Sequence, residues 1–293
     1  MATDFKQQYD KYLSVFNDFL QDAYESLDFN APKTITQAMN YAVQGGGKRI
    51  RPVLCLATAD ALSVPFEKVK EFCVAIESIH SYSLVHDDLP AMDNDDFRRG
   101  KLSTHKKFGE ANGILAGDAL LNFAFEYCLS KNDFTIEDAK ALKIIAEFAG
   151  YRGMIAGQVL DLQNENNDCA DEKVLYEICF NKTAKLIMAP ILVACALSGN
   201  KYYKNLYDYG YNLGILFQII DDVMDVEGTL ESIGKTPNKD KDSNKLTSVR
   251  VFGLEGAKNR AKFHYEQCKG ALIGVKNSEF LALFADAMFV RRK

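Results

Sequence analysis

Apolar residues recur at helical spacing through most of this chain. Within each segment they cover more than one helical face, which is typical of helices buried in a large bundle. Alternating strand patterns are scarce, and short polar breaks such as "SKND" separate the segments. The pattern therefore predicts an all-α protein, with long helices over residues 70–88, 111–129, 141–162, 173–197 and 207–226.

The breaks between these segments also bear on domain organisation. None of them is a low-complexity linker, and no short-period repeat divides the chain. The 293 residues, 47% of them hydrophobic, are enough to bury a large core without disulfides. We therefore expect one all-helical domain over residues 1–293.

Net charge and cysteine usage narrow the range of possible functions and cellular compartments. The formal net charge of −5 argues against nucleic-acid binding, because nucleic-acid binders are usually basic. Seven cysteines, with no CxxC pair, fit reduced thiols better than a disulfide framework. The N-terminal segment lacks the apolar run of a signal peptide, and no stretch approaches the ~20 consecutive apolar residues of a membrane span. We expect a cytoplasmic protein without a membrane span.

Aspartates are concentrated in two places, and the first place holds five of them between Asp87 and Asp96. An ideal helix would turn Asp93 about 120° away from Asp87. Pro90 lies between the two and breaks the helical ladder. A helix that ends near Leu89, with the chain folding back, would bring Asp93 beside Asp87.

The second cluster lies in "FQIIDDVMD" (217–225). Carboxylates this close to one another and to apolar residues repel and lose hydration, so a cation must compensate them. The alternative is a helix end that faces solvent. Four polar side chains fall within roughly one 100° arc of the predicted helix, namely Gln218, Asp221, Asp222 and Asp225.

The two clusters together indicate a site for magnesium and phosphate. Oxygen ligands without accompanying Cys or His spacing favour Mg²⁺ over zinc. Mg²⁺ held by few carboxylates usually completes its shell with water and phosphate oxygens. Arg98 and Arg99 follow the first cluster and can donate charge-assisted hydrogen bonds to the same anion. His80 lies on the helical face of Asp87, although a lone helical histidine is often a core residue.

A glycine-rich basic segment, "QGGGKRIRP" (44–52), complements the acidic clusters. Its glycines let backbone N–H groups approach an anion, and Lys48, Arg49 and Arg51 neutralise the charge.

The chain contains no nucleotide-binding P-loop. "GTLESIGKT" (228–236) has one residue too many between its glycines and follows a helix rather than a strand. The basic stretch at 233–245 is better explained as a polar lid loop, in which Lys235 and Lys245 are the best phosphate ligands.

These motifs stand in the order of a known family. From about residue 30 to 250 the sequence resembles the trans-isoprenyl diphosphate synthases, most closely the bacterial farnesyl diphosphate synthases. The form DDLPAMD, with four residues between its second and last aspartate, resembles the bacterial type. The matching segments are "GGGKRIRP", "SIHSYSLVHDDLPAMDNDDFRRG", "THKKFGEANGILAGDALL", "GQVLDL", "NKTAKL", "FQIIDDVMDV" and "GKTPNKDKDSNKLTS".

The resemblance implies a fold, an activity and partners. The fold would be a bundle of long helices around a central cavity, the type I isoprenoid synthase fold. The reaction would condense isopentenyl diphosphate with dimethylallyl or geranyl diphosphate, with Mg²⁺, to give (2E,6E)-farnesyl diphosphate. The family also suggests a homodimer.

The resemblance further implies a role for each matching position. The isopentenyl diphosphate site would comprise Gly47, Lys48, Arg51, His80 and Arg99. Mg²⁺ would be held by Asp87 and Asp93 with Asp88 in support, and on the other side by Asp221 with Asp222 and Asp225 behind it. The allylic diphosphate site would comprise Arg98, Lys182, Thr183, Gln218, Lys235 and Lys245. Lys182, Thr183 and Gln218 would be the catalytic residues, and Thr183 and Gln218 would sit near the developing carbocation.

The chain departs from the family pattern in the lid. Asn238 stands where the family usually has glycine, and Ser248 stands where tyrosine is usual. The C-terminal "RRK" (291–293) resembles the basic tails that close over such sites.

Tyr82 is the candidate for setting product length. It lies five positions before Asp87, about 7.5 Å along a helix, and bacterial farnesyl synthases typically carry an aromatic residue there. A plain helical wheel instead puts Ser83 nearest the Asp87 face, and a tyrosine that only packs in the bundle is the alternative.

Three other functions remain open at this point: a longer-chain (C20) synthase, a class I terpene cyclase and a noncatalytic regulatory subunit. A cyclase would lack a second diphosphate site, so "GGGKRIRP" with His80 argues against it. A regulatory subunit usually loses one aspartate cluster, and both are present here.

Overall fold

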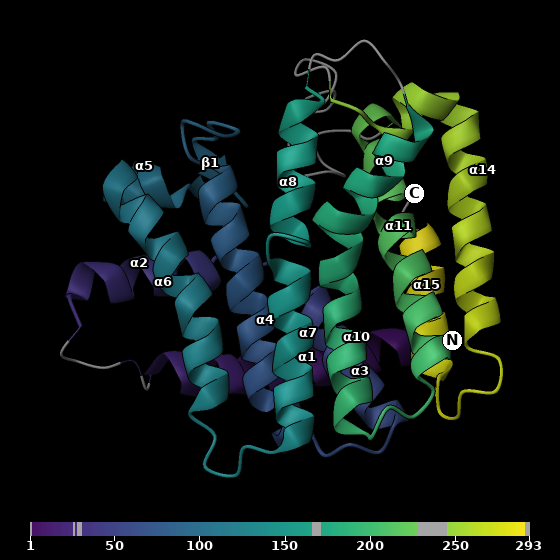
Figure 1. Cartoon of the computed structure of the whole chain (residues 1–293), viewed down its shortest axis with the longest axis horizontal. Helices are drawn as coiled ribbons and strands as arrows, with labels where there is room; N and C mark the ends of the chain where they lie inside the picture. The colour runs from purple at the N-terminus through teal and green to yellow at the C-terminus, as the bar shows by residue number, and fades with distance from the viewer. Residues whose placement is uncertain (1, 26, 28–30, 166–170, 228–244, 291–293) are drawn as a thin grey trace.

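The computed structural model describes residues 2–25, 27, 31–165, 171–227 and 245–290. These residues are almost entirely helical (Figure 1), which confirms the all-α prediction. The elements are α1 (Ala2–Glu25), α2 (Lys33–Val43), α3 (Ile50–Ala61), α4 (Phe66–Asp87), β1 (Phe97–Arg98), β2 (Lys101–Leu102), α5 (Thr104–Phe108), α6 (Glu110–Leu129), α7 (Ile136–Ala149), α8 (Met154–Gln163), α9 (Glu172–Ile178), the π-helical turn η1 (Cys179–Ala184), α10 (Lys185–Leu197), α11 (Tyr203–Glu227), α14 (Ser248–Ala271) and α15 (Glu279–Val290).

The long helices stand side by side, and α1 crosses behind them (Figure 1). Helix α10 lies inside the bundle, where it packs against α3, α4, α7 and α11. Every residue from Leu186 to Ala196 is buried in that helix. The all-round apolar pattern of the sequence therefore corresponds to a helix in the middle of the bundle.

Two of the predicted helices are interrupted in the structure. The segment 141–162 is split between α7 and α8, which Figure 1 shows stacked in one column. Gly150 ends α7 with extended backbone (φ −75°, ψ −166°). A side chain at Gly153 would lie 2.0 Å from the carbonyl oxygen of Phe148, so only glycine fits this break. The segment 173–197 is interrupted by η1.

The stretch Glu172–Leu197 is the one part of the described chain that is long and apolar enough to cross a membrane. However, 78% of its most apolar window is buried inside the protein. A core helix of a soluble bundle has the same length and composition, so this stretch is weak evidence for a membrane span.

A buried histidine makes the stability of this bundle depend on pH. His264 on α14 is 4% exposed, and its Nδ1 lies 2.9 Å from Oδ1 of Asn212 on α11. Burial, and next the charge of Arg260, lower the pKa of His264 to about 4. The folded protein therefore keeps this ring neutral at a pH where the unfolded chain binds a proton.

We predict that the fold loses stability through His264 as the pH falls from about 6.5 to 4. Since one pKa unit corresponds to about 1.4 kcal/mol, the full effect is roughly 3 kcal/mol. His264→Gln removes this titration. The difference in free energy of unfolding between wild type and variant, measured in urea at several pH values, should change across that range. A difference that stays constant with pH would contradict the prediction.

Candidate active site

The first aspartate cluster is built where α4 ends. Asp88 caps the helix, and the chain then turns sharply through Pro90. The backbone N–H of Asp93 donates to the carbonyl oxygen of Asp87 (2.8 Å), and that of Asp95 donates to the carbonyl oxygen of Asp88 (3.2 Å). The chain thus folds back as the sequence predicts, and Asp93 lies beside Asp87.

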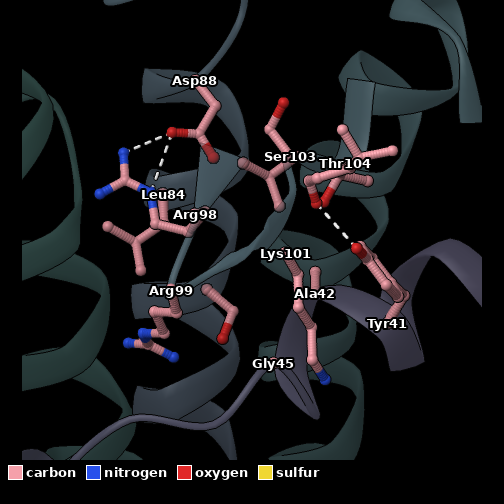
Figure 2. A pocket seen from close by; sticks show the side chains of 13 residues that line it. Tyr41, Ala42, Gly45, Leu84, Asp88, Arg98, Arg99, Lys101, Ser103 and Thr104 are labelled. Atoms are coloured by element: carbon pink, nitrogen blue, oxygen red, sulfur yellow. Dashed lines mark hydrogen bonds and ion pairs between the residues drawn. The ribbon is translucent and has the colours of Figure 1, made fainter. Parts of the chain in front are cut away.

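A short β-hairpin holds an arginine against this turn. Nε of Arg98, on β1, donates to Oδ1 of Asp88 (2.9 Å), and Nη2 bonds to the same oxygen (Figure 2). Asp95 lies 3.7 Å from Nη2 of Arg98. Burial raises the pKa of Asp88, and the Arg98 guanidinium opposes that rise. Asp88 therefore positions Arg98.

The charge of the Asp87 carboxylate is less well compensated than that of Asp88. Burial is the main reason that its pKa is raised to about 6, and Asp93 and Asp88 add to the rise. Lys182 and Arg98 act in the opposite direction. A cation beside this carboxylate would relieve both the lost hydration and the repulsion.

The second cluster lies near the C-terminal end of α11. Asp221 is half-buried, whereas Asp222 and Asp225 are buried. Oδ1 of Asp225 has no hydrogen-bond partner among the described residues. Asp222 accepts from Nε2 of Gln218 (2.8 Å) and from the backbone N–H of Ser248 at the start of α14 (2.7 Å).

One cavity of about 360 Å³ brings the two clusters together. Asp93, Asp95 and Arg98 line it from the α4 side, and Asp221 and Asp222 line it from α11. In the described part of the chain, no three Asp, Glu, His or Cys side chains meet closely enough to hold a metal ion alone.

Lys182 enters the cavity from η1, and its Nζ lies 2.5 Å from Oδ2 of Asp161 on α8. Two glycines fix the backbone of this π turn. A Cβ on Gly157 of α8 would lie 2.1 Å from the backbone nitrogen of Lys182, and one on Gly214 of α11 would lie 2.4 Å from Cα of Ala184. The π turn is therefore packed tightly between α8 and α11, with a glycine at each contact.

The remaining predicted phosphate ligands are placed only in part. Nζ of Lys245 lies 3.2 Å from Oδ1 of Asp93 and 3.8 Å from Oε1 of Glu165. Ser248 begins α14. Lys235, Asn238 and the basic tail 291–293 lie outside the described residues.

The glycine-rich segment gathers a second group of cations. Arg99 donates to the carbonyl oxygen of Gly46. A Cβ on Gly47, where φ is +115°, would lie 2.6 Å from Cζ of Arg99, so this position needs glycine. Burial, and next the charge of Arg51, hold the pKa of His80 well below its usual range. Arg51 and Arg99 thus form one electropositive group beside a neutral His80.

The two other basic residues of this segment have different surroundings. Lys48 is exposed, and its backbone carbonyl accepts from the hydroxyl of Tyr9. Arg49 is buried in left-handed backbone (φ 50°), with Nη1 2.7 Å from Oε1 of Glu77 and Nη2 2.5 Å from the carbonyl oxygen of Val43. Arg49 therefore forms a structural ion pair with Glu77. Its place in "KRIR" does not distinguish it from the other basic residues of the segment.

Sequence reasoning missed the partners that hold the site residues. Asp161 and Gly157 both belong to "GQVLDL", a segment noted for its resemblance but given no role. Glu77 precedes His80 by three residues and carries no motif signal of its own.

Comparison with known proteins decides the family. The family model described as polyprenyl synthetase matches residues 32–273. The chain belongs to the polyprenyl synthetase family.

Individual relatives agree with this assignment. A farnesyl diphosphate synthase from Micrococcus luteus is 42% identical over 250 residues, which are 84% of each chain. A geranylgeranyl pyrophosphate synthase from Arabidopsis thaliana is 37% identical over 266 residues, 88% of this chain and 74% of that one. A solved geranyltransferase from Helicobacter pylori, complexed with magnesium and isoprenyl diphosphate, matches with a TM-score of 0.83 at 33% identity, covering 96% of this chain and 95% of that one. The protein is a prenyltransferase with the all-α type I isoprenoid synthase fold.

We predict that Gly157→Ala damages the site through Lys182. The new Cβ overlaps the η1 backbone, so the turn must shift, and a shift of about 1 Å in a positioning element costs about 100-fold in turnover. Gly270→Ala on α14 is the matched control, because a Cβ there meets nothing within 4 Å. Steady-state turnover of the two variants tests this. Equal activities would show that η1 tolerates displacement.

Proposed function

We propose that this chain is a farnesyl diphosphate synthase, which condenses isopentenyl diphosphate with dimethylallyl or geranyl diphosphate. The observation that carries the proposal is one cavity that carboxylates line from two sides, Asp93 and Asp95 from the turn after α4 and Asp221 and Asp222 from α11. Three cations line the same cavity, namely Arg98, Lys182 and Lys245. The separate group at Gly47, Arg51, His80 and Arg99 supports a second diphosphate site. A class I terpene cyclase has no use for that second site.

The residues fit magnesium as the metal. The donors are hard carboxylate oxygens, and Oδ1 of Asp225 is buried without a partner among the described residues. Asp87 and Asp93 would hold the metal from one side, with Asp88 in support, and Asp221 from the other, with Asp222 and Asp225 behind it. Bound Mg²⁺ would supply positive charge to the leaving diphosphate.

The chain's own side chains would perform the remaining work. Arg98, Lys182 and Lys245 would bind the allylic diphosphate, with Lys235 from the lid. Thr183 and Gln218, joined by a 2.6 Å hydrogen bond, would face the developing carbocation. The C1–O bond of the allylic substrate breaks, the double bond of isopentenyl diphosphate attacks C1, and the released diphosphate accepts the proton. Lys48, Arg51, His80 and Arg99 would hold the diphosphate of the attacking substrate.

The surroundings of Tyr82 support its role as the floor of the product pocket. Its side chain is 5% exposed, and its ring packs edge-on against His86 with ring centres 5.7 Å apart. Its hydroxyl is buried without a partner among the described residues, and burial raises its pKa to about 12. A bulky, unionised ring one and a half turns before Asp87 would stop a growing chain.

A homodimer in the cytoplasm completes the proposal. Exposed apolar side chains on α6 (Ile114, Leu115) and α8 (Ile155, Val159) offer surface for a second copy to cover. The six cysteines within the described residues are all free and buried, which suits a reducing compartment. Sedimentation at twice the mass of the chain would support the dimer, and sedimentation as a monomer would contradict it.

We predict that Asp87→Ala and Asp221→Ala each lower turnover by ~10²–10³ or more, because the leaving diphosphate is then under-neutralised. Asp96→Ala is the control, because the Asp96 side chain is exposed and pairs with the surface Lys106 at 2.8 Å. Turnover is measured at saturating Mg²⁺, with folding checked by circular dichroism. Near-normal turnover in either cluster variant would overturn the two-sided metal model.

Product analysis tests the proposed function directly. Purified protein given isopentenyl and dimethylallyl diphosphates should release farnesyl diphosphate (C15). Tyr82→Ala should retain the chemistry and shift the products to C20 or longer, whereas the half-exposed Tyr203→Ala should not. Cyclic hydrocarbons from the wild type would favour the cyclase, and C20 from the wild type would favour the longer-chain synthase. A Tyr82→Ala enzyme that still stops at C15 would place the floor elsewhere.

A further inference from the structure

A hydrogen-bond relay joins η1, α11 and α14 beside the cavity. Oγ1 of Thr183 donates to Oε1 of Gln218 (2.6 Å), and Nε2 of Gln218 donates to Oδ1 of Asp222 (2.8 Å). The backbone N–H of Ser248 donates to Oδ2 of Asp222 (2.7 Å). Thr183 is 9% exposed and Asp222 is 4% exposed, so water competes little for these bonds.

Asp222 sets the direction of the whole relay. Each of its oxygens receives an N–H, and the start of α14 favours a negative charge at this point. Gln218 must therefore turn its amide nitrogen toward Asp222, which leaves its carbonyl oxygen for Thr183. The Thr183 hydroxyl then donates its single hydrogen to Gln218, and its oxygen has only lone pairs left to offer.

The opposite arrangement is strongly disfavoured. If the Gln218 amide flipped, its carbonyl oxygen would face the Asp222 carboxylate across 2.8 Å with no hydrogen between them. Two facing acceptors in a buried place lose a hydrogen bond and repel each other. The charge on Asp222 thus holds the relay in one orientation.

We propose that Asp222 is a positioning residue, which acts through Gln218 so that an allylic cation meets oxygen lone pairs of Thr183 rather than a hydroxyl hydrogen. This inference rests on the proposed function, because ionisation of an allylic diphosphate is what forms such a cation. It replaces the supporting metal role that the resemblance implies for Asp222. Asp221, one residue earlier, keeps its role toward the metal.

The variant Asp222→Asn reverses the relay with little change of shape. The amide oxygen that it introduces still accepts from the Ser248 N–H, but its amide nitrogen now faces Gln218. Gln218 must flip and donate to Thr183, which frees the hydroxyl hydrogen to point elsewhere. We expect kcat to fall about 100-fold. The KM for isopentenyl diphosphate should stay within about twofold, as should the calorimetric affinity for Mg²⁺ in the presence of inorganic diphosphate, since neither contact involves the relay.

A compensating change tests the direction of the relay itself. In the double variant Asp222→Asn/Gln218→Glu, the carboxylate introduced at position 218 accepts both from the amide at position 222 and from the Thr183 hydroxyl, so the original polarity returns. The double variant should regain about tenfold or more of the lost kcat. Gln218→Glu alone sets two carboxylates against each other and should unfold at a lower temperature than the double variant. Thermal unfolding therefore measures the coupling without any turnover.

Each result decides the proposal. If Asp222→Asn weakens Mg²⁺ binding as much as Asp221→Asn does, Asp222 is a metal ligand and the proposal is wrong. If the double variant improves on neither single variant, in kcat or in unfolding temperature, the polarity argument fails. A wild type that condenses nothing would refute the proposed function, while the thermal coupling would still test the relay.

Discussion

Carboxylates that repel one another face a single cavity, and most of the surrounding structure serves to hold them there. Burial raises the pKa of Asp87 to about 6, and Asp93 and Asp88 add to that rise. Three cations of the cavity are each paired with a carboxylate. Arg98 bonds to Asp88, Lys182 to Asp161 and Lys245 to Asp93. Under the proposed function, a bound metal and diphosphate would give both sets of charges better partners.

Rigid packing keeps the opposed groups in register. The π turn that carries Lys182 and Thr183 touches α8 at Gly157 and α11 at Gly214, with no room for a methyl group at either place. On the other side, the buried Arg49–Glu77 pair fixes the start of α3 beside the electropositive group. Such a site spends little free energy on reorganisation during the reaction, because its dipoles are already oriented.

The sequence predicted the features that depend on local chemistry. Pro90 predicted that the chain folds back after the helix, and the backbone hydrogen bond from Asp93 to Asp87 confirms this prediction. The features that it missed depend on tertiary contacts. Apolar periodicity does not predict the π turn at 179–184. Buried apolar residues continue from the turn into the next helix, so the pattern resembles one uninterrupted helix. The four residues "KRIR" do not reveal that Arg49 turns inward, since its partner Glu77 lies 28 residues away on another helix. The role of Tyr82 stays a prediction.

Thermal unfolding with magnesium and inorganic diphosphate tests the central claim most directly. If the opposed carboxylates require a metal that carries an anion, Mg²⁺ and diphosphate together should raise the unfolding temperature by roughly 5 °C at a hundredfold excess over the dissociation constant. Either ligand alone should raise it much less, and Asp87→Asn should lose the joint effect. An equal rise with diphosphate alone, or an undiminished rise in Asp87→Asn, would contradict the account.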